Sequence, residues 1–222
     1  MRRAFMGGLL LLAAPLAAGE KEILVVDPGH AAMGAVFYVE GSKNTITFES
    51  KAPLEDIVGT STALRGYLVF DPEHPEAGGA GRLLVPTASL ETGLPLRDRH
   101  LLGKEWLDAE SFPVIAFSVD SVRDVKLVKE SEAFKTYDLV ASGSLELHGK
   151  SDVVEVAARI TYLSESEETR KKQPGNLLAV RAEFPVSLAA FGIEGFEGIV
   201  GSKVGETIAV SVNLIGTDRE PE

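Results

Sequence analysis

Apolar and polar residues alternate with a period of two along most of the chain. The alternation is clear at residues 45–50, 113–122, 137–147, 153–162, 177–188 and 207–216. Such alternation is typical of antiparallel strands with one buried face. Residues 63–71 and 81–92 are less regular but rich in strand formers, and a short strand is expected near residues 35–40. The sequence therefore predicts an all-β fold of about eight strands.

Two segments break this pattern. Residues 97–109 predict a short helix, because Leu101, Leu102, Trp106 and Leu107 fall on one helical face and Asp98 is placed to cap it. Residues 164–176 carry no apolar side chain and are expected to form a mobile hairpin tip.

An open sheet of eight strands leaves two exposed edges, which proteins tend to remove by closing the sheet. We therefore expect an extended, eight-stranded, antiparallel, lipocalin-like β-barrel with one short helix near its mouth. A barrel of this size is either filled by side chains or just wide enough for one slender ligand. A two-sheet sandwich fits the same periodicity and remains the alternative.

The N-terminal residues resemble a secretory signal peptide. Arg2 and Arg3 precede an apolar run at residues 7–18, which is shorter than the roughly 20 residues that span a bilayer. Small residues predict cleavage near Ala18 or Gly19, with an uncleaved anchor as the alternative. We expect a signal peptide at residues 1–19, a single domain at residues 20–222 and a periplasmic or secreted location.

The composition excludes several function classes. The formal net charge of -11 argues against nucleic acid and against adhesion to anionic lipid. The absence of cysteine excludes disulfides and thiolate chemistry. Only 7% of the residues are aromatic, which argues against a membrane-embedded barrel, so no stable membrane insertion is expected. The oligomeric state stays open, a homodimer being one option.

The cluster Arg97-Asp98-Arg99-His100 is the clearest candidate for chemistry. As an active site it would use His100 as a general base oriented by Asp98. However, neighbouring residues of a helical turn do not face each other, and the chain has no Gly-x-Ser-x-Gly motif. The four histidines also lack the spacing of a metal site. A structural or ligand-contacting role is favoured, with a metal-dependent or hydrolytic enzyme on the same barrel as the alternative.

Several motifs resemble those of the YceI-like family. They are Ser-Leu-x-Thr-Gly at residues 89–93, Arg-Asp-x-His-Leu at 97–101 and Phe-Pro-x-Ile-x-Phe at 112–117. Residues 25–30, 64–72, 143–149 and 187–214 also resemble family segments, so the likeness covers roughly residues 25–215. The alanines after His30 depart from the family's His-Ser-x-Val-x-Phe, so the N-terminal half of the pore is expected to differ.

The resemblance implies an exported, lipocalin-like barrel whose hydrophobic pore binds a polyisoprenoid or another long-chain amphiphile, for transport, storage or stress protection. An isoprenoid quinone is a further possible ligand, and no enzyme cofactor or metal is implied. The partner is thus a hydrophobic small molecule.

The inward strand faces supply the expected pore lining, although the same residues would also suit an ordinary core. The aromatic and aliphatic candidates are Phe48, Phe117, Tyr137, Ile160, Tyr162 and Phe184. Ala141, Gly143, Ala158 and Ala182 are expected to leave the volume for a ligand. Arg97 and His100 are expected to hold its head group, with Trp106 as an aromatic flank.

Overall fold

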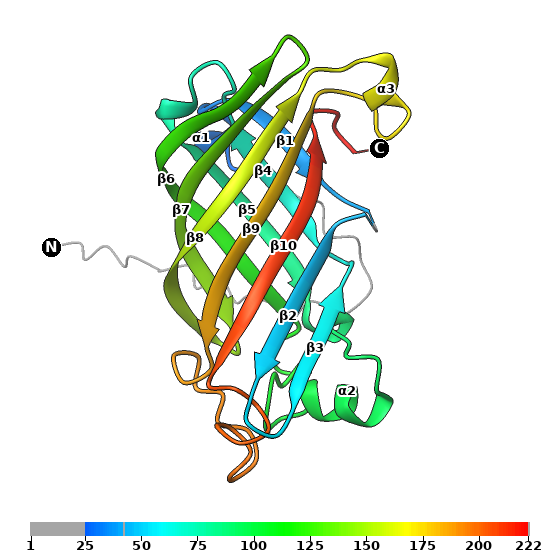
Figure 1. The fold of residues 1–222 in the computed structure, drawn as a ribbon, viewed down its shortest axis with the longest axis vertical. Helices are drawn as coiled ribbons and strands as arrows, with labels where there is room; N and C mark the ends of the chain where they lie inside the picture. Colours follow the sequence, from blue (N-terminus) through cyan, green and yellow to red (C-terminus); the bar gives the residue numbers. More distant parts are fainter. Residues whose placement is uncertain (1–24, 42, 222) are drawn as a thin grey trace, which may run out of the picture.

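The computed structural model describes residues 25–41 and 43–221, and the expected signal peptide lies outside them. The described chain forms a closed antiparallel β-barrel (Figure 1). Its strands are β1 (Ala35–Val39), β2 (Thr45–Lys51), β3 (Asp56–Ser61), β4 (Arg65–Phe70), β5 (Gly79–Pro86), β6 (Val114–Ser131), β7 (Phe134–Leu147), β8 (Lys150–Leu163), β9 (Leu177–Ser187) and β10 (Thr207–Thr217).

These strands make an eight-stranded barrel because two of its strands are each split in two. β1 and β2 both pair with β10, β1 at Tyr38–Thr217 and β2 over residues 45–50. Together they therefore occupy a single strand position of the barrel, next to β10. β4 pairs with β1 and β3 pairs with β2, so β3 and β4 together occupy the following strand position. The predicted closed barrel is confirmed, and the sandwich alternative is wrong.

The barrel has two unlike ends. In Figure 1, α1 (Pro28–Ala31) and α3 (Glu167–Arg170) lie at the upper end, and α2 (Pro95–Leu101) lies beside β3 at the lower end. At the lower end β3 does not pair with β5. Instead Thr60 exchanges two backbone hydrogen bonds with Glu91, of 2.8 and 3.0 Å. The segment that follows Glu91 runs into α2, which therefore sits where the strand ladder is interrupted.

The helix beside the lower end is shorter than predicted, and Asp98 does not cap it. α2 begins at Pro95, whose fixed φ suits a first helical turn, and no side chain caps its start. The Asp98 carboxylate instead accepts hydrogen bonds from the backbone N–H and the hydroxyl of Thr92, at 2.7 and 2.5 Å. No helix in the described part of the chain is long and apolar enough to cross a membrane.

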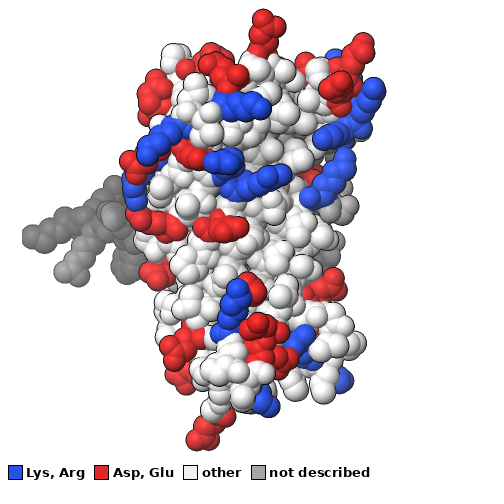
Figure 2. All heavy atoms as spheres, viewed as in Figure 1, with Lys and Arg blue, Asp and Glu red and all other residues white. Residues whose placement is uncertain are grey.

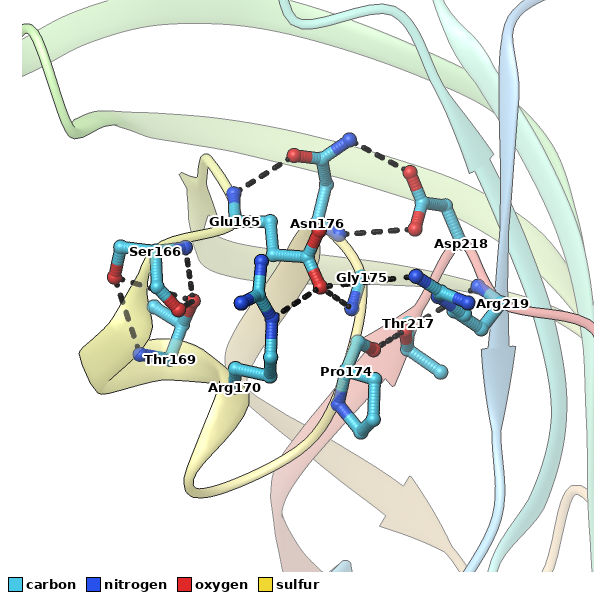
Figure 3. Close-up of polar contacts among 10 residues, drawn as sticks. All are labelled: Glu165, Ser166, Thr169, Arg170, Pro174, Gly175, Asn176, Thr217, Asp218 and Arg219. Atoms are coloured by element: carbon cyan, nitrogen blue, oxygen red, sulfur yellow. Dashed lines mark hydrogen bonds and ion pairs between the residues drawn. The ribbon is translucent and has the colours of Figure 1, made fainter.

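The polar segment at residues 164–176 is tied down, contrary to the expected mobile tip. α3 starts with a reciprocal capping box between Ser166 and Thr169. The Glu165 carboxylate accepts from the Gly175 N–H at 3.0 Å and pairs with Arg170 (Figure 3). The Thr217 hydroxyl donates to the Pro174 carbonyl, and the Asn176 N–H donates to the Asp218 carboxylate at 2.9 Å, so the segment is held against the end of β10.

The barrel interior contains two hydrophobic clusters. The upper cluster includes Phe37, Phe70 and Tyr137, and the lower cluster includes Trp106 and Leu145. Outside, on the face seen in Figure 2, acidic and basic side chains are interspersed and no continuous basic surface is visible. The two clusters differ in how completely they fill the barrel, and this difference creates the candidate site.

Candidate functional site: an apolar cavity at the lower end

The lower half of the barrel encloses a cavity of about 830 Å³. This volume is within the range of sites that bind small molecules. The cavity wall is almost entirely apolar, and the polar residues on it among those the structure describes are Ser50, Glu55, Thr92, Arg97, His100 and Lys203. Such a wall favours a ligand that is mostly hydrocarbon.

The alternating pattern of four strands builds this wall. Side chains two residues apart in a strand point to the same face, so each strand contributes alternate residues. The pairs are Ile115 and Phe117 from β6, Leu145 and Leu147 from β7, Phe184 and Val186 from β9, and Ile208 and Val210 from β10. The β2 residues Ile46 and Phe48 continue the wall toward β3.

Two segments without strand structure cover the lower end. One is α2 with the turns after it, and the other is the loop between β9 and β10. Phe196 of this loop lies between His100 and Trp106, with ring centroids 5.7 and 6.4 Å away and both contacts edge-on. The backbone of Gly195 lies directly on the indole, since a Cβ there would be 2.6 Å from Trp106. The two covering segments therefore meet through aromatic rings.

The cavity reaches the molecular surface at this cover. Leu94, Leu96 and Phe196 all line the cavity, yet 54%, 59% and 42% of their surfaces are exposed. Large apolar side chains at such exposure form an apolar rim around the opening. A hydrophobic ligand entering beside α2 would contact this rim first.

The polar groups near the rim are mostly paired with one another. Arg97 forms an ion pair with Glu55 at 2.7 Å and donates from Nε to the Thr92 hydroxyl at 3.0 Å. This guanidinium therefore ties α2 to the turn between β2 and β3, as expected for a structural role. Lys203 lies on the rim, and its ammonium group has no hydrogen bond or ion pair with any described residue.

The structure brings six of the nine predicted site residues to this cavity: Phe48, Arg97, His100, Trp106, Phe117 and Phe184. Ile160 instead borders a separate cavity of about 100 Å³ in the upper half. Tyr137 and Tyr162 border neither cavity. The Tyr137 hydroxyl donates to the Pro72 carbonyl at 3.0 Å, and burial raises its pKa. Tyr162 packs edge-on against Phe37.

The expected origin of the free volume was wrong. Ala141, Ala158 and Ala182 border only the small upper cavity, and Gly143 borders neither. The small residues therefore lie in the upper cluster, together with large neighbours such as Phe37 and Phe70. The large cavity is surrounded mainly by full-sized side chains and is bordered by α2 and the residues around it.

Sequence reasoning missed the loop residues of the rim. Leu94 and Leu96 flank Pro95, and Phe196 lies between the turn glycines Gly195 and Gly198. Neither segment has strand or helix periodicity to explain its apolar residues. Large apolar residues that no predicted element requires were the signal that could have identified this rim.

The four histidines do not converge. His30 bonds through Nδ1 to the Tyr67 hydroxyl at 2.9 Å, while His148 approaches the Phe191 carbonyl at 3.2 Å and packs against Phe112. His74 is exposed beside Glu76, and His100 contacts Phe196. Within the described residues, no three His, Asp or Glu side chains are grouped as metal ligands.

Comparison with solved structures shows the same barrel in other proteins. BcnA of Burkholderia cenocepacia aligns with a TM-score of 0.61 at 20% identity, over 81% of this chain and 99% of its own. A polyisoprenoid-binding domain from Saccharophagus degradans, implicated in plant cell wall breakdown, aligns with a TM-score of 0.57 at 13% identity, over 82% of this chain and 98% of its own. At these identities the likeness shows the fold alone.

Sequence comparison identifies the family. A UPF0312 protein of Pseudomonas fluorescens is 35% identical over 112 residues, which is 50% of this chain and 53% of that protein. Protein YceI of Salmonella arizonae is 29% identical over 104 residues, 47% of this chain and 49% of that protein. The aligned region thus spans about half the length of these curated relatives. The YceI-like domain matches residues 26–215, and the chain therefore belongs to the YceI-like family.

Proposed function

We propose that this protein binds the hydrocarbon part of a long-chain amphiphile, an isoprenoid or isoprenoid quinone, in the lower cavity. The observation that carries the proposal is the apolar wall around about 830 Å³ of open volume. Transfer of each methylene from water contributes about 0.8 kcal/mol, so ten buried methylenes offset the entropy lost on association. The polyisoprenoid-binding domain among the structural neighbours supports this ligand class.

The head group is proposed to stay at the rim beside α2. His100 and Lys203 lie there, together with the part of Arg97 that faces the cavity. A polar head at this position keeps its contact with water while the chain enters the barrel, which avoids the cost of burying an unpaired polar group. Export to the periplasm and transport or storage of the lipid belong to the same proposal.

A blocked cavity provides the test. Val210 points into the cavity, whereas its neighbour Ala209 is exposed on the outer face of β10. Val210→Trp is expected to fill the cavity and reduce binding of a long isoprenol at least tenfold, while Ala209→Trp binds as the wild type does. Binding is measured by titration of delipidated protein and by mass spectrometry of lipid retained after native purification. The proposal fails if the wild type neither retains nor binds any lipid.

A further inference from the structure

Two phenylalanine rings divide the interior of the barrel. Phe117 comes from β6 and Phe184 from β9, strands that are separated by β7 and β8 in the sheet. Their rings stack across the interior with centroids 6.3 Å apart and planes at 19°. Both residues border the large lower cavity and the small upper one, as do Leu83 and Val212. The stacked pair is therefore the partition between the two cavities.

The partition is held from one side. The Phe117 ring lies against β7 at Gly143, where a Cβ would be 2.8 Å from the ring. The β7 backbone therefore prevents Phe117 from moving toward that strand unless β7 moves too.

The space above the partition is nearly filled. Phe37 packs edge-on against Tyr162 with centroids 6.2 Å apart, and Phe70 packs against Tyr137 at 5.8 Å. Beside Phe70 lies the small cavity of about 100 Å³. A hydrocarbon chain that entered at the rim would fill the lower cavity and then meet the two rings.

We infer that the Phe117–Phe184 pair is the floor of the binding site and sets the longest chain that the site can bury. This inference rests on the function proposed above. At roughly 30 Å³ for each water-sized group, the lower cavity holds on the order of 28 carbon atoms, or about six isoprene units. Until the chain reaches this length, each added methylene that is buried raises the affinity about fourfold. Units beyond the limit remain in solvent and add nothing.

The test measures affinity against chain length in a series of isoprenols from three to ten isoprene units. Delipidated wild-type protein is expected to bind more tightly with each added unit and to reach a plateau near six units. Phe184→Ala removes one ring of the floor and connects the lower cavity to the upper one. The space open to the chain then grows by about 100 Å³ and by the volume of the ring. This gain is enough to move the plateau by about one unit, at roughly 30 Å³ per group.

Val186→Ala is the matched control. Val186 lies two residues along β9 on the same face and borders only the lower cavity. This variant is expected to weaken binding of every isoprenol while the plateau stays at the wild-type length. Phe117→Leu is a milder change of the floor that preserves the packing around it, so it provides the test if Phe184→Ala does not fold. Phe117→Leu is expected to move the affinity plateau to longer isoprenols, as Phe184→Ala does.

The outcomes separate the two claims. If no isoprenol binds the wild type, the proposed function is wrong. If the wild type binds but its affinity keeps rising through ten units, the floor is not where the rings lie. The floor is also refuted if folded Phe184→Ala or Phe117→Leu protein keeps the wild-type plateau, and in both cases lipid binding itself stands.

Discussion

At the scale of single residues, Asn44 holds together the break between β1 and β2. Its side chain is completely buried. The amide oxygen accepts from the Ile215 N–H at 2.9 Å, and the amide nitrogen donates to the Glu40 carbonyl at 3.1 Å. The amide thus replaces backbone ladder bonds that the bend would otherwise leave unmade.

Asn44→Ala is expected to lower the free energy of unfolding by about 1–3 kcal/mol, because it leaves the partly buried Ile215 N–H without this acceptor. Urea denaturation followed by circular dichroism measures this change. Lys43→Ala, at the exposed neighbouring position, is the control and should stay within about 0.5 kcal/mol of the wild type. Equal stability of the two variants would show that the amide does not support the break.

The cluster from Arg97 to His100 shows which side-chain contacts could be predicted from residue spacing and which could not. Spacing correctly argued against a direct pair between Asp98 and His100, and the structure gives these side chains the separate partners Thr92 and Phe196. The sequence did not reveal that Arg97 would pair with Glu55, because these residues are 42 positions apart and meet only after the barrel closes.

At the scale of elements, strands with clean alternation were predictable, whereas β3, which lacks it, was not. β2, β7, β8, β9 and β10 lie within a few residues of their predicted ranges. β3 was missed, because Ile57 and Val58 are adjacent rather than alternating and Gly59 follows them. That glycine is required by packing, since a Cβ there would lie 2.0 Å from the Phe48 ring. Such a requirement arises between strands and leaves no local pattern.

The α3 segment was misjudged for a related reason, since its order comes from polar bonds rather than from apolar burial. Glu165 is central to these bonds (Figure 3). The Gly175 N–H and then Arg170 hold the pKa of the Glu165 carboxyl below its ordinary value of 4.5. The ionised form therefore stabilises the folded state above pH 4.5, and this contribution is lost as the pH falls through the folded-state pKa.

Glu165→Gln keeps an acceptor for Gly175 but removes the charge. We expect the variant to be less stable than the wild type at neutral pH and the difference to shrink as the pH falls below 4.5, where the wild-type side chain also becomes neutral. Urea unfolding of both proteins across this range measures the difference. A gap in stability that does not change with pH would show that the charge is not what stabilises the segment.

At the scale of the whole molecule, the barrel joins a packed upper half to a hollow lower half. The sequence predicted the closed barrel, and the family resemblance implied a pore with its mouth beside the helix. Neither showed that the upper half would be packed while the lower half is hollow. Inward side chains have the same alternating pattern in both halves. Whether they meet across the interior depends on contacts between strands that are distant in the sequence, which the local alternation does not encode.

Matched leucines on β7 test this division. Leu139 belongs to the upper cluster and Leu145 to the lower one, both point inward, and their exposed fractions are 7% and 5%. In delipidated protein, Leu139→Ala is expected to cost about 4 kcal/mol of unfolding free energy, and Leu145→Ala about 2 kcal/mol. The difference arises because Leu145 borders the cavity of about 830 Å³, whereas Leu139 borders only the small cavity of about 100 Å³, so Leu145 has fewer packing partners to lose.

A saturating isoprenol should change only one of these costs. The bound chain would supply the missing partners of Leu145, so Leu145→Ala should become more damaging, whereas the cost of Leu139→Ala stays the same. Denaturation with and without ligand gives all four values. Equal costs in the delipidated protein would mean that the two halves are packed alike, and the hollow that the proposed function requires would then be absent in solution.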